Sequence, residues 1–203
     1  METKTVVLIG PPGSGKTAIW RRLLLRAAIN DDVAITFLPE IATEFLTFAP
    51  KAKETMSAEL FQGAIAFGQK IAESVAFETL KQSSASLGIV VLDRGIHDKC
   101  VYSSSNALNH TLGITEDFTN YDLVLFCEGE FQGNRGNPFR RENPKEVKQL
   151  KKLTYRVWKK HTPSSNFVTI PYVPSIEQKT ELCVCAINKH FRRTIFKEEF
   201  NDV

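Results

Sequence analysis

Short apolar runs alternate along the chain with longer amphipathic stretches, and this alternation predicts the fold. The apolar runs have the length of buried strands and lie at residues 6–9, 34–38, 89–92, 123–127 and 167–170. The stretches between them have helical spacing, near residues 16–29, 57–82, 98–109, 144–161 and 175–195. Alternating strands and helices favour a parallel sheet covered by helices on both faces. We therefore expect an α/β three-layer sandwich around a five-stranded parallel sheet.

The longest predicted helix, residues 57–82, combines an apolar stripe with two amides. Apolar residues recur at spacings of three and four positions, at Leu60, Ala64, Phe67, Ile71 and Val75. We expect this stripe to face the core. Gln62 and Gln69 share a neighbouring face, and paired amides can read the polar edge of a base or ring. Gln62 is a candidate substrate-binding residue, whereas Gln69 is more typical of a solvated helix glutamine.

Length, charge and cysteine content exclude few classes of protein. The chain has 203 residues, which suits one compact domain over residues 1–203, and its net charge of +3 does not by itself indicate a nucleic-acid partner. No apolar run reaches the roughly 18 residues of a membrane span, and no signal peptide is visible. Cys100, Cys127, Cys183 and Cys185 match no zinc pattern and favour reduced cysteines in a cytoplasmic protein. Nothing in the sequence indicates an oligomeric state.

The segment GPPGSGKT follows the first predicted strand and precedes the first predicted helix, as a phosphate-binding P-loop requires. Its glycines allow a tight loop whose backbone N–H groups point at phosphate oxygens, beside the positive N-terminus of a helix. Lys16 would reach the β- and γ-phosphates, and the Thr17 hydroxyl would bind Mg²⁺. The candidate ATP-binding residues are therefore Gly10, Pro11, Pro12, Gly13, Ser14, Gly15, Lys16 and Thr17.

Two carboxylates and an arginine follow later strands, at the sheet edge where ligands of such folds bind. Glu40 could accept the proton of an acceptor hydroxyl or bind Mg²⁺ through water, and Glu44, one helical turn later, is a weaker candidate. Asp93 follows four apolar residues, the setting of a Mg²⁺-orienting aspartate. Arg94 can hold a phosphate or an acceptor through its planar guanidinium. An exposed loop carboxylate and a purely structural Asp–Arg pair are the alternatives.

The residues directly after Arg94 are less specific. Gly95 would let the backbone turn sharply. Asp98 is a candidate for substrate binding, and His97 is more typical of a surface or hydrogen-bonded histidine than of a catalytic base.

The segment after the fourth strand is rich in glycine, asparagine and proline, and it predicts a long irregular loop over residues 128–143. Arg140 and Arg141 lie in it. A solvated basic loop is one interpretation, and a mobile arginine-bearing lid that excludes water from the triphosphate is the other. Asn143, Pro144 and Glu146 then have the spacing of a helix start.

The combination of GPPGSGKT, EIATEFL, VVLDRGIHDKCVY and FRRENPKEV, in this order, resembles NadR-like P-loop domains from residue 5 to about residue 180. These are ribosylnicotinamide-kinase-like members of the group of ATPases and kinases that carries the AAA label. The resemblance implies an ATP-dependent phosphotransferase fold akin to nucleoside and thymidylate kinases. It implies that Lys16 and Thr17 hold ATP and Mg²⁺, that Asp93 and Arg94 form the site, and that Arg140 and Arg141 sit in the lid.

The chain is also similar, more distantly, to deoxynucleoside kinases. That family has a glutamate at a strand end, a Phe-Gln pair on a helix and an acidic-Arg motif. The matching residues here are, in that order, Glu40, Phe61-Gln62 and Asp93-Arg94. This sequence departs from the pattern because Asp93 replaces the usual glutamate and no proline follows Glu40. The resemblance therefore implies phosphotransfer without identifying the acceptor.

Three functions fit these motifs. A kinase for a small molecule, with a nucleoside or nucleotide-like acceptor, is the leading interpretation, and a regulatory ATPase that binds a partner protein is the alternative. A GTPase is disfavoured because His190 and Phe191 follow Asn188-Lys189, so the guanine-reading Asn-Lys-x-Asp sequence is absent. A kinase needs a second cavity that faces the phosphates, and this cavity separates the first two functions.

Overall fold

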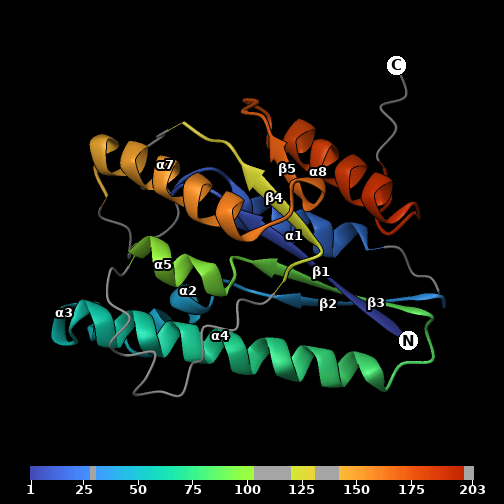
Figure 1. Ribbon diagram of the computed structural model, residues 1–203, viewed down its shortest axis with the longest axis horizontal. Coiled ribbons are helices and arrows are strands. Elements are labelled where there is room, and N and C mark those ends of the chain that lie inside the picture. The colour runs from blue at the N-terminus through green and yellow to red at the C-terminus, as the bar shows by residue number, and fades with distance from the viewer. Residues whose placement is uncertain (28–30, 103–119, 131–141, 199–203) are drawn as a thin grey trace.

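A five-stranded parallel sheet forms the centre of the molecule (Figure 1). The computed structural model describes residues 1–27, 31–102, 120–130 and 142–198. The strands lie in the order β2-β3-β1-β4-β5. Their bounds are β1 Glu2–Ile9, β2 Val33–Leu38, β3 Leu87–Asp93, β4 Leu123–Cys127 and β5 Phe167–Ile170. The predicted parallel sheet of five strands is confirmed.

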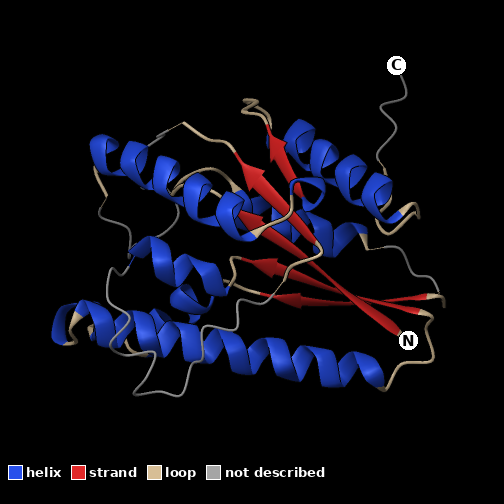
Figure 2. Ribbon diagram, in the orientation of Figure 1, coloured by secondary structure: helices blue, strands red, loops and turns tan. Residues whose placement is uncertain are grey.

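Helices cover both faces of this sheet (Figure 2). On one face, α1 (Lys16–Arg26) and α8 (Ile176–Phe191) pack against Val6 and Leu8 of β1. On the other, α4 (Ala58–Lys81) and α7 (Pro144–His161) pack against Val7 and Ile9. Successive side chains of a strand point to opposite faces, so an uninterrupted apolar run is what a strand buried on both sides needs. The predicted three-layer sandwich is confirmed.

The remaining helices are short. They are α2 (Ile41–Phe48), α3 (Ala52–Thr55), η1 (Ile96–Asp98), α5 (Lys99–Tyr102) and η2 (Ser164–Asn166). The hydrophobic pattern did not predict α2 and α3 because segments of this length carry too few turns to show a period. Of the helix predicted near residues 98–109, only the part up to Tyr102 lies among the described residues. No helix in the described ranges is both long and apolar enough to cross a membrane.

The predicted inward face of α4 is wrong. Leu60, Phe67, Ile71 and Val75 are 45%, 47%, 49% and 59% exposed, so the apolar stripe faces outward. The buried residues of α4 are Phe61, Gly63, Ala66, Gln69, Glu73, Ala76 and Leu80 instead. Ala66, Ala76 and Leu80 pack on the sheet, and Phe61 packs against Leu46 and Ala52. Gln69 and Glu73 are both buried, and Gln69 Nε2 donates a hydrogen bond to Glu73 Oε1 at 2.8 Å, so the two polar groups are partnered. Partnered polar groups can be buried at little cost, and the polarity of the sequence therefore indicated the wrong face.

Candidate active site

The loop between β1 and α1 has the backbone geometry of a phosphate-binding loop. Gly10, Gly13 and Gly15 have φ angles of 145°, 79° and 89°, a region that L side chains rarely adopt. At Gly10 a Cβ atom would also lie 2.3 Å from the carbonyl oxygen of Cys127. Gly15 directly precedes α1, so the loop lies at the N-terminus of that helix. A ligand phosphate placed here would meet backbone N–H groups and the positive end of the helix dipole.

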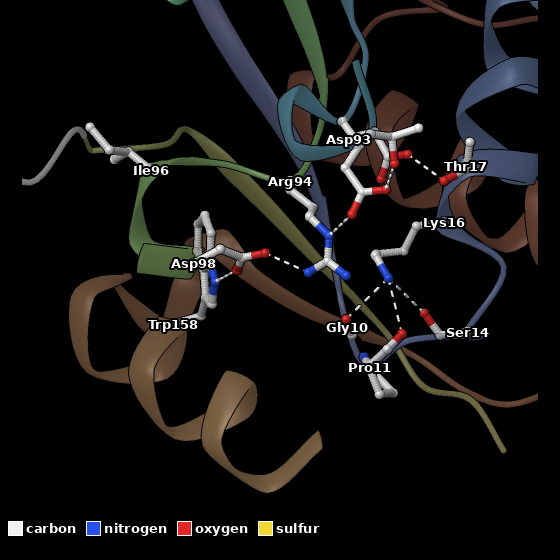
Figure 3. Close-up of polar contacts among 12 residues, drawn as sticks. Gly10, Pro11, Ser14, Lys16, Thr17, Asp93, Arg94, Ile96, Asp98 and Trp158 are labelled. Atoms are coloured by element: carbon white, nitrogen blue, oxygen red, sulfur yellow. Dashed lines mark hydrogen bonds and ion pairs between the residues drawn. The ribbon is translucent and has the colours of Figure 1, made fainter. Parts of the chain in front are cut away.

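Lys16 is buried against its own loop (Figure 3). Its Nζ donates to the carbonyl oxygens of Gly10 and Pro11, at 3.1 and 3.0 Å, and to Ser14 Oγ at 3.3 Å. These acceptors are carbonyl and hydroxyl oxygens, and they hold the ammonium group in the loop. From this position the ammonium group can donate charge-assisted hydrogen bonds to an anion bound in the loop.

A second lysine, which sequence reasoning missed, supports the loop from outside. Lys179 of α8 is buried, and its Nζ donates to Ser14 O at 2.8 Å and to Glu128 O. Burial lowers the pKa of this lysine. The contact joins residues 165 positions apart, so no local signal in the sequence could reveal it.

Thr17 and Asp93 meet beside the loop. Thr17 Oγ1 donates to Asp93 Oδ2 at 2.6 Å. Asp93 is 1% exposed, and its other oxygen, Oδ1, is buried with no hydrogen-bond partner among the described residues. Burial raises the pKa of Asp93, and the charge of Glu40 raises it further. A buried carboxylate oxygen without a partner, next to a threonine hydroxyl, fits a Mg²⁺ ion that arrives with a nucleotide and keeps several waters.

Arg94 joins two acidic groups at the end of β3 (Figure 3). Its Nε donates to Glu40 Oε1 and its Nη1 to Asp98 Oδ2, both at 2.5 Å. Burial alone lowers the pKa of Arg94, but the negative charges of Glu40 and Asp98 oppose this effect, and the guanidinium stays ionised. The backbone of Arg94 has φ 77°, uncommon for a residue other than glycine. The geometry therefore fixes one orientation of the guanidinium beside Glu40.

Aromatic side chains form hydrogen bonds with the turn that carries Arg94 and Asp98. Trp158 of α7 is fully buried, and its Nε1 donates to Asp98 Oδ1 at 2.7 Å. Ile96 N donates to the Tyr121 hydroxyl at 2.8 Å, and this hydroxyl donates to Glu73 Oε1 at 2.9 Å. Burial raises the pKa of Glu73. Trp158, Tyr121 and Glu73 were not predicted as supports, because their distance from the turn in the sequence hides these contacts.

His97 lies inside this aromatic cluster and not on the surface. It is 0% exposed and packs against the rings of Tyr121, Trp158 and His161. The expectation of a surface histidine is therefore wrong. A ring enclosed on three sides by aromatic groups has a packing role in the turn.

Gly95 is needed for close packing in the same cluster. A Cβ atom at this position would lie 2.6 Å from Tyr121 Oη and 2.9 Å from Trp158 Cη2. We expect Gly95→Ala to lower the free energy of unfolding by about 1–3 kcal/mol, because overpacking displaces rigid rings. Urea denaturation measures this change. In the matched control Gly68→Ala, the new methyl group would meet only Ile41 Cγ2 at 3.2 Å. An equal loss in both variants would contradict this role of Gly95.

A cavity of about 140 Å³ lies next to these groups. Leu46, Phe61 and Ile65 supply apolar walls, and Gln62 and Tyr102 supply polar groups. The described residues that line it are Pro12, Glu40, Ala42, Thr43, Leu46, Lys53, Phe61, Gln62, Ile65, Arg94, Asp98, Tyr102 and Glu142. Because Pro12 belongs to the P-loop, the cavity and the loop share a boundary. A flat apolar ring with polar edges fits a lining of this kind.

The structure brings together most of the predicted site residues. Lys16, Thr17 and Asp93 form one group at the P-loop, and Glu40 and Arg94 lie between this group and the cavity. Gln62 and Asp98 line the cavity. Asn143 caps α7 as expected, in a reciprocal pair of hydrogen bonds with Glu146. Arg140 and Arg141 lie outside the described residues, as does most of the lid predicted over residues 128–143.

A family model described as an AAA domain matches residues 5–179. The chain belongs to this family. The matched range agrees with the extent of the NadR-like resemblance found in the sequence. A comparison with curated proteins found no match.

Solved structures with this fold include two of NadR. NadR in complex with NAD and AMP-PNP matches with a TM-score of 0.67 and 19% sequence identity. NadR in complex with NR matches with a TM-score of 0.70 and 18% identity. Each match covers 98% of this chain and 52% of the NadR chain, so this chain spans about half the length of NadR. Deoxyadenosine kinase from M. mycoides, with products dCMP and dCDP, has a TM-score of 0.58 and 12% identity, covering 91% of this chain and 99% of that one. These similarities confirm the kinase-like P-loop fold of this AAA-family chain.

Proposed function

We propose that this AAA-family chain is an ATP-binding, Mg²⁺-dependent phosphotransferase that acts on a hydroxyl group of a nucleoside-like small molecule. The observation that carries the proposal is the cavity beside the P-loop, with Glu40 and Arg94 at the boundary between them. A protein that only binds or hydrolyses a nucleotide has no need of a second cavity at this place. The fold shared with NadR and with deoxyadenosine kinase supports the same conclusion.

Each group of site residues has a separate role in the proposed reaction. The P-loop and Lys16 bind and orient the phosphates. Thr17 and Asp93 would hold Mg²⁺, which would supply positive charge beside the phosphates. Glu40 accepts the proton of the acceptor hydroxyl. Arg94 keeps the Glu40 carboxylate in place through the Nε contact, and its bond to Asp98 keeps the guanidinium in place. Hydrogen-bonded support of this kind keeps a reacting group in a productive geometry.

Charge in the cavity favours an acceptor without a phosphate group. The carboxylates of Glu40, Asp98 and Glu142 line it, against the cations of Lys53 and Arg94. Arg94 is already paired with two of these carboxylates. A phosphorylated acceptor would bring further negative charge to a group of carboxylates, which is unfavourable in a buried site. A neutral or cationic nucleoside is therefore the better fit.

A transfer screen tests this function. The protein is incubated with Mg²⁺ and ATP labelled in the γ-phosphate, with nucleosides, nucleotides and pyridine ribosides as acceptors. We expect a nucleoside or riboside to become labelled and to raise ATP turnover by about tenfold or more. If no acceptor changes ATP turnover, the proposal is wrong and a regulatory ATPase becomes the better account.

Gln62 should contribute to acceptor binding and not to ATP binding. It lines the cavity wall and forms no hydrogen bond with the P-loop in the described part of the chain. We expect Gln62→Leu to raise the acceptor KM by about 10- to 100-fold, because a polar edge of the acceptor loses its partner, and to leave the affinity for ATP unchanged. Steady-state kinetics measures both. Gln149→Leu, at an exposed position of α7, is the matched control, and an equal KM change in both variants would contradict the role of Gln62.

A further inference from the structure

Helix α7 carries a concentration of positive charge that the proposed reaction does not use. It contains seven Lys and Arg residues and a single acidic residue, Glu146, so the helix alone is more positive than the whole chain, whose net charge is +3. The cations are Lys145, Lys148, Lys151, Lys152, Arg156, Lys159 and Lys160. Net charge alone did not indicate a nucleic-acid partner, because the rest of the chain offsets this local excess.

Six of these cations, all except Lys145, line one groove. It has a volume of about 800 Å³ and is bounded by α7 and the end of β4. Its lining is Phe126, Glu128, Lys148, Lys151, Lys152, Tyr155, Arg156, Lys159 and Lys160. None of these residues lines the acceptor cavity described above. The groove is therefore a candidate binding site distinct from the acceptor cavity.

Most of the positive charge in the groove is not neutralised by residues in the described part of the chain. Lys151 pairs with Glu128 at 2.9 Å, and Lys159 lies over the ring of Phe167. Lys148, Lys152, Arg156 and Lys160 form no ion pair with any described residue. They follow one another at intervals of four positions, and like charges at this spacing destabilise a helix. A bound polyanion would relieve that repulsion.

The shape of the groove and its one exposed ring indicate the class of anion. The helix has 18 residues and so is about 27 Å long, which suits a linear chain of charges better than a single phosphate. Tyr155, in the middle of the basic face, is 42% exposed, and the rings of Phe126 and Phe167 hold its own ring edge-on. A cationic groove with an exposed aromatic ring is how proteins bind single-stranded nucleic acid.

From these observations we infer that the α7 groove binds single-stranded nucleic acid. The cations contact successive phosphates, and a base stacks on Tyr155. A membrane surface fits this groove less well, because Tyr155 is the only large apolar side chain of α7 that is markedly exposed, and one ring offers little apolar surface for insertion.

Fluorescence anisotropy of a labelled oligothymidine of about 15 nucleotides tests this inference on the full chain. We expect saturable binding at about 50 mM salt, with an affinity that falls by about tenfold or more at about 200 mM salt. Lys152→Glu combined with Arg156→Glu should weaken binding by at least about tenfold and reduce the salt dependence. Tyr155→Leu, which keeps an apolar side chain against Phe126, should weaken binding by roughly tenfold through the loss of stacking.

The matched control is Lys70→Glu combined with Lys81→Glu. Both residues are exposed on α4, and the double variant changes the net charge by the same amount. Little change in the control, with ATP binding retained in all variants, would support the inference. The inference would be overturned if the oligonucleotide did not bind at up to about 100 µM protein, or if the two double variants lost affinity equally. It would also be overturned if phosphatidylserine vesicles bound to the groove and the oligonucleotide did not, or if Tyr155→Leu left the affinity unchanged, because an unselective polyanion site would then explain the binding.

Discussion

Lys16→Ala is expected to reduce ATP turnover by about 100- to 1000-fold, the cost of removing a charge that stabilises a transferring phosphoryl group. Lys16 Nζ is held over the loop by Gly10, Pro11 and Ser14, and these neutral groups cannot replace its charge. Affinity for the triphosphate should fall as well. Nucleotide binding by calorimetry and turnover by release of labelled phosphate measure the two effects.

Lys70→Ala is the control for Lys16→Ala, because Lys70 is an exposed lysine of α4. The far-ultraviolet circular dichroism spectrum of Lys16→Ala should match the wild type, since the loop keeps its glycines. If this variant binds and turns over ATP normally, the assignment of a P-loop is wrong.

Glu40→Gln should lower phosphate transfer by roughly 100-fold or more, because general-base catalysis contributes about that factor. Glutamine preserves the shape of the side chain but cannot accept the proton of the acceptor hydroxyl. ATP binding should persist, since Lys16, Thr17 and Asp93 are unchanged. Transfer kinetics with a saturating acceptor measure the loss.

Glu44→Gln gives the matched comparison for Glu40→Gln. Glu44 lies in the first turn of the same helix, α2, but is exposed and outside the cavity. Comparison of the two variants distinguishes the loss of the proton acceptor from the loss of any carboxylate near the site. Transfer at the wild-type rate by Glu40→Gln, or an equal loss in both variants, would show that Glu40 is not the base.

The parts of the site that were predictable from the sequence depend on local chemistry. The P-loop combines glycine, lysine and threonine within eight residues, so its geometry follows from the segment itself. Glu40, Asp93 and Arg94 follow apolar strands, and a parallel sheet brings the ends of its strands to one edge. Their position at that edge could therefore be predicted, although the pairing of Arg94 with both Glu40 and Asp98 could not.

The parts that were not predictable depend on contacts between distant residues. Trp158 bonds to Asp98 across 60 positions, and Tyr121 bonds to Glu73 across 48. The buried Gln69–Glu73 pair reversed the expected orientation of α4, because the polarity of a residue does not reveal whether it has a partner in the core. In the same way, the net charge of the whole chain does not reveal that six cations of α7 line one groove.

The fate of the γ-phosphate distinguishes a phosphotransferase from an ATPase. ATP labelled at this position is mixed with the wild-type protein, Mg²⁺ and the best acceptor from the screen, and the labelled products are separated. The account predicts that most of the label is on the acceptor, that omission of the acceptor lowers ATP consumption by about tenfold or more, and that Glu40→Gln abolishes most of the transfer. Release of the label only as inorganic phosphate, at a rate that no acceptor changes, would contradict it.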